Sequence, residues 1–443
     1  MKRVFSAAAA VACMLGFAAQ ALSGGFALEE QSVSGLGNAY AGGAAVVEDA
    51  STIFFNPAGL TRLKGQNAAA GVHLIVPHAR FEKDLALDAA GAPLTGGEGG
   101  DAAESRLVPN AYYGVTLGSG LALGLGVSVP FGLSTEYPKD WVGRYQAVRS
   151  EVAVLNLNSS AAYRLTKRWS VGAGFNAQRL EAEMTNRVDF GAILAPTLGT
   201  LPQSADGTSK LTGTNWSYGW NVGALYELGD DTRIGLAYRS RVKHDIEGEA
   251  EFDLPPGLPA PAADALAAQG FRNDDAKVSI TLPDSASLSL FHRLNRHWAA
   301  MVDLTWTNWS TFDELRVRFK SGLPDDVTEE QWEDTWRLAL GLTYTPSSVW
   351  TWRAGVAYDQ DPIPDARHRT PRIPSADRIW TAFGLGYRPA PWLGFDLGYA
   401  HLFVADAKID RQVATEQDAL KGALRGSYEL SADIVSAQLT ASF

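Results

Sequence analysis

The sequence predicts an all-β transmembrane fold, an antiparallel outer-membrane β-barrel of about 14 strands with an N-terminal hatch, or plug, in its lumen. Three features of the 443-residue chain predict it: segments that alternate large apolar with small or polar residues, connections that alternate between short and long, and aromatic residues beside the short connections. Alternation alone describes a soluble sandwich equally well. An even strand number with short turns on one side and long loops on the other is typical of outer-membrane barrels.

The chain is predicted to begin with a secretory signal peptide, residues 1–23. Lys2 and Arg3 form a positive n-region, a short apolar core follows, and Ala21-Leu22-Ser23 is a small-residue cleavage site. The apolar core is too short to cross a bilayer as a helix, and no later run approaches the roughly 20 apolar residues required. The only cysteine is Cys13, so the mature chain is expected to have no thiol, disulfide or cysteine-based metal site.

Residues 24–65 are predicted to form the hatch. The stretch from Gly24 to Leu60 is rich in Gly and Ala and fits neither a strand nor a packed helix. An ordered but irregular segment ahead of a closed barrel needs a sheltered place, and the lumen provides one. A pore that carries its own plug is a selective transporter rather than an open sieve. Residues 66–443 then form the barrel, without a linker or a break in composition.

The barrel strands are predicted to follow one another along residues 66–443. They begin near Asn67, Leu107, Leu121, Glu151, Arg168, Thr214, Thr232, Lys277, His297, Thr335, Val349, Arg378, Pro391 and Tyr428. Short connections are expected at 118–120, 166–167, 229–231, 295–296, 346–348 and 388–390. Long connections are expected near 82–106, 132–149, 184–213, 247–276, 320–334, 360–377 and 406–427.

Aromatic residues flank the short connections, as a periplasmic girdle requires. They are Tyr163, Trp169, Tyr226, Trp298, Tyr344, Trp350, Tyr387 and Trp392. The last strand alternates apolar residues up to the terminal Phe443, an ending typical of the signal that the barrel assembly machinery recognises. The sequence therefore predicts a multi-pass protein in the outer membrane of a Gram-negative bacterium.

Charge and motifs exclude several classes of function. The chain has 38 basic and 49 acidic residues, and removal of Lys2 and Arg3 leaves a net charge of about −13, which offers no basic footprint to nucleic acid. No His-Glu-x-x-His motif occurs, and the nearest approach to Gly-x-Ser-x-Gly, Gly126–Pro130, lies in a predicted strand. The acidic run 325–334 is expected to be a solvated loop, which also suits divalent cations on a lipopolysaccharide surface. We expect no enzyme activity, no cofactor and no metal site, since an outer-membrane lipid hydrolase needs a catalytic constellation that these residues do not assemble.

Short sequence words carry a family resemblance over nearly the whole chain. They are Ser34-Gly35-Leu36-Gly37, Ala39-Tyr40, Glu48-Asp49-Ala50, Asn56-Pro57-Ala58-Gly59, Ala162-Tyr163-Arg164-Leu165, Gly174-Phe175-Asn176-Ala177 and Tyr238-Arg239-Ser240. In these words the chain resembles the FadL family of outer-membrane long-chain fatty acid transporters. The resemblance implies passive uptake of long-chain fatty acids or similar hydrophobic molecules, captured in an extracellular apolar groove, held in the lumen and released laterally. Uptake of aromatic or aliphatic hydrocarbons stays open as an alternative, and a general porin is a further one.

The third predicted strand contains Val129-Pro130-Phe131-Gly132-Leu133. Proline donates no ladder hydrogen bond, so inside a closed barrel it marks a bulge or a kink. The alternative interpretation is that the strand ends there and a loop begins. The resemblance favours a kink at Pro130, Phe131 and Gly132 that leaves a lateral gap in the wall.

The resemblance also assigns roles to residues of the hatch. The hatch motif Asn56, Pro57 and Ala58 is expected to pack near the gap. There the Asn56 amide would cap exposed backbone groups of the kink, and Pro57 would hold the turn rigid. Phe26 is expected to line the ligand pocket.

Two basic residues are expected to bind the ligand's carboxylate in the lumen. They are Arg187 and Arg316, the positions that best match the basic pair of the family. Arginine suits bidentate binding of a carboxylate. The alternative interpretation is that both are ordinary rim charges paired with Asp189 or Glu314.

The long loops at 184–213 and 247–276 are the richest in Leu, Pro and Ala, and the resemblance implies that they form the outward groove. Residues 261–269 are predicted to form a short amphipathic helix within it. Burial stabilises a bound alkyl chain by about 0.8 kcal/mol per CH₂, so such a groove captures it without an energy source. The partners expected are this hydrophobic ligand, outer-membrane lipid and lipopolysaccharide, and the protein is expected to be a monomer.

Overall fold

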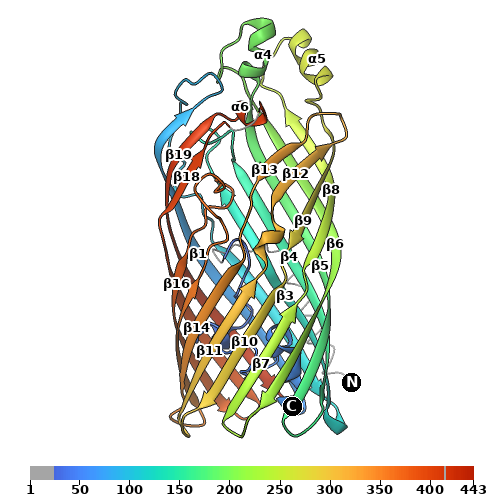
Figure 1. Cartoon of the computed structure of the whole chain (residues 1–443), viewed down its shortest axis with the longest axis vertical. Helices are drawn as coiled ribbons and strands as arrows, with labels where there is room; N and C mark the ends of the chain where they lie inside the picture. Colours follow the sequence, from blue (N-terminus) through green and yellow to red (C-terminus); the bar gives the residue numbers. More distant parts are fainter. Residues whose placement is uncertain (1–23, 414–415) are drawn as a thin grey trace.

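The structure, a computed structural model, describes residues 24–413 and 416–443. It is an upright closed β-barrel with helices and long loops at one end and short turns at the other (Figure 1). Nineteen strand segments form one antiparallel sheet, and the sheet closes because β1 (Gln66–Leu87) pairs with both β2 (Arg106–Thr116) and β19 (Ala423–Ser442). The predicted signal peptide lies outside the described residues.

Five pairs of consecutive segments each continue one pass across the wall, so the segments make 14 passes and the predicted fold is confirmed. The interrupted passes are β7 (Thr232–Arg239) with β8 (Val242–Asp253), β9 (Asp274–Leu282) with β10 (Ser285–Arg293), β11 (Trp298–Thr307) with β12 (Glu314–Phe319), β13 (Asp326–Glu329) with β14 (Thr335–Tyr344), and β17 (Leu393–Val404) with β18 (Ala407–Arg411). The other passes, besides β1, β2 and β19, are β3 (Leu121–Glu136), β4 (Arg149–Arg164), β5 (Trp169–Asp189), β6 (Asp206–Glu227), β15 (Trp350–Asp359) and β16 (Arg378–Ala390).

The helices are short and lie in the N-terminal segment and the connections. They are α2 (Val33–Leu36), α3 (Thr52–Phe55), α4 (Phe190–Leu198), α5 (Ala260–Ala268) and α6 (Glu416–Ala419), with the 3₁₀ turns η1 (Pro57–Arg62), η2 (Gly118–Gly120) and η3 (Trp309–Thr311). Helix α5 confirms the helix predicted for residues 261–269. Within the described part of the chain, no helix has the length and apolar character needed to cross a membrane.

Several long connections are shorter than the sequence predicts, and the one between β5 and β6 changes most. Strand β6 begins at Asp206 rather than near Thr214, because Asp206–Gly213 continue to pair with the end of β5. The connection predicted over 184–213 therefore shrinks to the residues around α4. Strands β5 and β6 extend the wall outward and carry α4 to the top of the barrel, beside α5 (Figure 1).

The wall shows large apolar side chains on its outside and small or polar ones inside, the reverse of a soluble protein. Along β14 the outward Trp336 is 49% exposed, whereas the inward Arg337 and Ala339 are buried. At the short-turn end the outward-facing Trp169, Trp298, Trp350 and Trp392 are all exposed. An apolar outer face bordered by aromatic residues is the pattern that hydrocarbon and its interfaces require.

The N-terminal segment, residues 24–65, lies inside the barrel and is almost entirely buried. Asn38 Nδ2 donates to the backbone oxygens of Leu342 (2.9 Å) and Ala354 (3.3 Å) in β14 and β15. On the first strands, η1 packs against β3, β4 and β5. Because the segment contacts opposite sides of the wall, it spans the lumen.

Candidate functional site

Strand β3 loses its neighbour β2 part-way along its length. The two strands pair up to Ala111 opposite Val127, and the β2 residues from Arg106 to Asn110 pair only with β1. Pairing resumes at the isolated bridge between Ala103 and Thr135. Within the described residues, this leaves one stretch of wall without a β2–β3 ladder.

The proline lies in this stretch. Strand β3 continues to Glu136, so the alternative that it ends at Pro130 is wrong. Its register against β4 shifts between Ser128 and Phe131, which leaves Val129 and Pro130 without β4 partners. A proline at a bulge is what its missing N–H dictates.

The free edge of β3 is covered by the N-terminal segment instead of β2. Leu28 N donates to Pro130 O (2.8 Å), and Gly132 N donates to Phe26 O (3.0 Å). The Gln31 side chain adds a bond from Nε2 to Val129 O (2.8 Å). We call these three hydrogen bonds the clasp. They satisfy backbone groups that would otherwise face an open gap.

The expectation that Asn56 caps the kink is wrong. Asn56 Nδ2 donates to Ala44 O (2.7 Å) and to Ala224 O of β6 (3.0 Å), and its Oδ1 accepts from Ala58 N (3.0 Å). The motif packs against wall residues that have no side chain, because a Cβ at Gly172 or at Gly223 would collide with it. Missing side chains on β5 and β6, not the kink, therefore position Asn56, Pro57 and Ala58.

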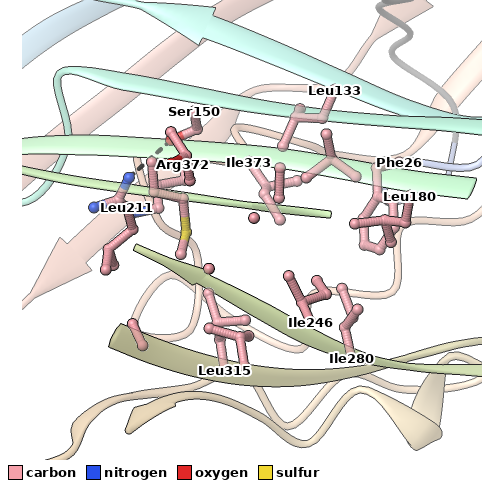
Figure 2. Close-up of a pocket in the computed structure, with 18 of the residues that line it drawn as sticks. Phe26, Leu133, Ser150, Leu180, Leu211, Ile246, Ile280, Leu315, Arg372 and Ile373 are labelled. Carbon is pink, nitrogen blue, oxygen red and sulfur yellow. Dashed lines mark hydrogen bonds between the residues drawn. The ribbon is translucent and has the colours of Figure 1, made fainter. Parts of the chain in front are cut away.

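An inner cavity with about 840 Å³ of space between its walls lies above the clasp. Its wall is almost wholly apolar and comes from β3–β6, β8, β9, β12 and the loop 360–377. Figure 2 shows Phe26 and Leu180 at one end of the cavity and Arg372 at the other. The lining residues are Phe26, Leu133, Ser150, Val152, Leu180, Ala182, Met184, Leu211, Thr212, Gly213, Ile246, Gly248, Ala276, Val278, Ile280, Phe312, Leu315, Glu330, Arg372 and Ile373.

Phe26 closes the inner end of this cavity, as the sequence predicts for a lining residue. Its ring is 2% exposed and contacts four aromatic rings, with centroid distances of 5.0 Å to Trp309, 5.8 Å to Trp332, and 5.9 Å to both Phe131 and Phe312. Since Phe26 O is also part of the clasp, one residue joins the cavity floor to the kinked strand.

A second cavity, of about 900 Å³, lies beyond Phe131, and its lining is as polar as it is apolar. Pro130 and Phe131 of the kink line it, together with the partly buried Arg239 and the buried Arg337. Phe26 and Phe131 thus stand between an apolar space above and a mixed space that borders the kink.

An outer cavity of about 1290 Å³, partly open to solvent, adjoins the inner one through Met184, Leu211, Leu315 and Arg372, which line both. Arg187 lines this outer cavity, so the structure places it at the mouth. Its guanidinium donates to the Thr208 hydroxyl and to Asp206 O, not to Asp189.

Arg316 does not line either cavity. Its guanidinium binds both carboxylate oxygens of Glu314 (2.6 and 2.9 Å) and also Asp325 (3.1 Å). Two acids thus use three of its five N–H donors and neutralise its charge. The pairing with Glu314 that the alternative interpretation expects is present, and it argues against Arg316 as the residue that meets the ligand's carboxylate.

Arg372 also lies at the site, although the sequence did not predict it there. It lines both cavities from the loop 360–377, and its Nη1 donates to Ser150 Oγ (2.9 Å) and Arg149 O (3.4 Å). Burial lowers the pKa of its guanidinium, as expected of a cation held away from water. One signal in the sequence pointed to it, because Arg372 is the single charged residue in the short apolar segment Pro371-Arg372-Ile373-Pro374, which two prolines make rigid.

No set of three or more His, Cys, Asp or Glu residues in the described ranges is placed to hold a metal ion. An outward apolar wall, a filled lumen and apolar cavities that reach a kinked strand define an outer-membrane transport protein for hydrophobic molecules. Residues 14–443 match the family "Outer membrane protein transport protein (OMPP1/FadL/TodX)", and the chain belongs to this family, whose members are transporters and not enzymes. The protein is accordingly located in the outer membrane of a Gram-negative bacterium.

Individual relatives agree with this assignment. The chain is 31% identical, over 435 residues, to the long-chain fatty acid transport protein of Escherichia coli (strain K12). The match covers 92% of this chain and 94% of the relative. It resembles the crystal structure of a Pseudomonas aeruginosa FadL homologue with a TM-score of 0.88 and 27% identity, over 95% of this chain and 100% of that one. The Pseudomonas putida toluene transporter TodX shares the fold, with a TM-score of 0.70 and 18% identity over 96% and 99% of the two chains.

Proposed function

We propose that this protein takes up long-chain fatty acids or similar hydrophobic molecules passively, holds them in the inner cavity and releases them sideways at the kink of β3. The observation that carries the proposal is that an apolar cavity ends at the clasp, over the one described stretch of wall where β2 and β3 do not pair. The 31% identity to a long-chain fatty acid transport protein favours the fatty acid over other hydrophobic ligands.

Capture begins at the outer end. Helices α4 and α5 pack together through Phe190, Leu194, Ala262 and Leu266, and Phe271 joins this cluster to the outer cavity. The apolar cluster suits an alkyl chain leaving water, at about 0.8 kcal/mol per CH₂ buried. Arg187 at the mouth is positioned to attract an anionic head group there.

Lateral release follows from what blocks the axis. The N-terminal segment, acting as the hatch, fills the lumen below the inner cavity, and its contacts with the wall are many. The clasp is much smaller, since it consists of three hydrogen bonds. Undoing the clasp exposes the unpaired edge of β3 to the ligand and to lipid, at far less cost than removing the whole hatch.

The test is a variant in which Val129–Leu133 becomes a regular alternating strand able to pair with β2. The barrel closes in either form, because closure satisfies more backbone groups than it breaks. Purified variant should bind oleate normally, whereas cells that rely on it for oleate uptake should lose uptake. Normal transport by the straightened variant would show that the ligand passes down the axis past a moving hatch.

The surroundings of the barrel are also part of the proposal. We propose that it works as a monomer, with lipid and lipopolysaccharide against its outer face. The terminal Phe443 is 73% exposed, and its backbone pairs with Gln66 at the seam of the barrel. This placement suits a residue recognised by the assembly machinery before β1 closes onto β19.

The aromatic residues around Phe26 also fit an aromatic hydrocarbon, and TodX, which shares the fold, is named a toluene transporter. A flat neutral ligand would stack there without needing a cation. Comparing toluene with oleate as competing ligands for the purified protein separates the two candidates.

A further inference from the structure

We propose that Arg372 is the residue that binds the ligand's carboxylate, with the alkyl chain lying along the inner cavity toward Phe26. This inference rests on the proposed function and names the head-group chemistry of the ligand: a monocarboxylate on a long apolar chain. In Figure 2 the Arg372 head lies beside Ser150, at the far end of the cavity from Phe26.

The first argument is that Arg372 has donors to spare. A guanidinium carries five N–H donors, and the hydrogen bonds of Arg372 to protein come from Nη1 alone. Among the described residues Arg372 forms no hydrogen bond or contact ion pair with an acid, and Asp326 and Glu330 attract it only through longer-range Coulombic interactions. The remaining donors are therefore available to a bidentate anion.

The second argument is that two other bases close to the cavities are already paired with acids. Lys421 is paired with Asp326 at 2.7 Å, and Arg316 is held by Glu314 and Asp325. The acid in the inner wall, Glu330, accepts a hydrogen bond from Trp332 Nε1 (3.0 Å) and forms no ion pair with Arg372. Among the lining residues of the inner cavity, Arg372 is the base that a buried carboxylate meets.

The third argument is energetic. Arg372 is desolvated at the end of an apolar cavity, where Asp326 and Glu330 attract it only at longer range and no contact ion pair forms. A carboxylate that enters the same cavity is desolvated as well. Pairing removes both penalties at once, whereas a neutral head group relieves neither. Arg372 thus gives the cavity a preference for acids over alcohols or hydrocarbons of equal length.

The backbone around Arg372 is held independently of its side chain. Tyr137 Oη donates to Pro371 O (2.8 Å), and Thr135 Oγ1 donates to Arg372 O (3.2 Å). A change limited to the side chain should therefore leave the loop 360–377 in place, and Arg372→Leu is a usable variant.

The experiment compares Arg372→Leu with the matched control Arg316→Leu, each titrated with oleate and with oleyl alcohol. We expect Arg372→Leu to lower the affinity for oleate by more than about tenfold, as for loss of a buried charge partner. Its affinity for oleyl alcohol should stay within about twofold of the unchanged protein, because the apolar burial is the same. Arg316→Leu should change neither affinity, and Arg372→Lys should recover part of the loss of oleate binding.

Three outcomes would overturn the inference. They are an unchanged oleate affinity in Arg372→Leu, an equal loss of oleyl alcohol, which would mean that Arg372 only shapes the cavity, or an equal loss of oleate in Arg316→Leu. Failure of the unchanged protein to bind either ligand would instead refute the proposed function.

Discussion

A disulfide across the clasp tests whether the N-terminal segment must leave β3 during uptake. Ala27 and Phe131 face each other across an antiparallel bridge, with the backbone hydrogen bonds on either side of the pair. In such a non-hydrogen-bonded pair the Cα atoms lie about 4.5 Å apart, within the range that a disulfide spans. Both side chains line the same cavity, and Cys13 is the only natural cysteine. The double change Ala27→Cys, Phe131→Cys therefore allows one bond and no other in the mature chain.

The strength of the clasp sets the expected effect. Three hydrogen bonds at about 1 kcal/mol each amount to about 3 kcal/mol. At that cost roughly one molecule in 150 is unclasped at any time. If release requires the clasp to open, a covalent bond that removes this population should stop release.

Uptake of radiolabelled oleate by cells that produce the double variant is the assay. We expect uptake by the oxidised form to fall at least about tenfold, and dithiothreitol to restore it, while the purified oxidised protein still binds oleate. The two single-cysteine variants control for loss of the Phe131 ring and of the Ala27 methyl group. Equal uptake with and without the disulfide would refute the idea that release requires the clasp to open.

Two further predictions concern topology and the seating of the hatch. Tags inserted at Leu201 and Gly257, in the connections that carry α4 and α5, should be labelled on intact cells. A tag at Pro346, in a short turn, should not be labelled. The reverse pattern would contradict the strand assignment. Asn56→Ala leaves two backbone carbonyls without their donor and Ala58 N without its acceptor. The change should destabilise the seated hatch by about 3 kcal/mol and speed hydrogen exchange at the Ala58 amide. Unchanged protection of that amide would show that the motif does not hold the segment in place.

The barrel could be predicted from the sequence because its signals are local. Alternation within β14, turn residues at both ends of a pass and aromatic residues beside them each lie within a dozen positions. Pro130 marked the irregular stretch of β3 for the same reason, since a missing N–H needs no distant information. The start of β6 was misplaced because Asp206–Gly213 pair with β5 but lack the alternation of large apolar with small or polar residues.

The partners of the hatch could not be predicted, since they are set by strands far away in the sequence. Asn56 bonds to Ala224, 168 positions later, because the glycine at 223 leaves room for it. The residues that cover β3 begin at Phe26, in a stretch without any strand pattern. They form hydrogen bonds with β3 at the positions where β2 does not pair with it.

The same reasoning explains why Arg187 and Arg316 were chosen and Arg372 was not. A basic residue binds a ligand only if no nearer acid binds it first, and Glu314 lies two positions before Arg316, on the same strand. Residues two apart in a strand share a face, so this pairing was visible in the sequence and should have counted against Arg316. Arg372 lies in a loop, where no period gives the direction of its side chain. Only the folding of the loop 360–377 over Ser150 turns its charge toward the apolar cavity. Contacts between distant parts of the chain therefore set the direction of Arg372, whereas the acid that holds Arg316 lies on the same strand.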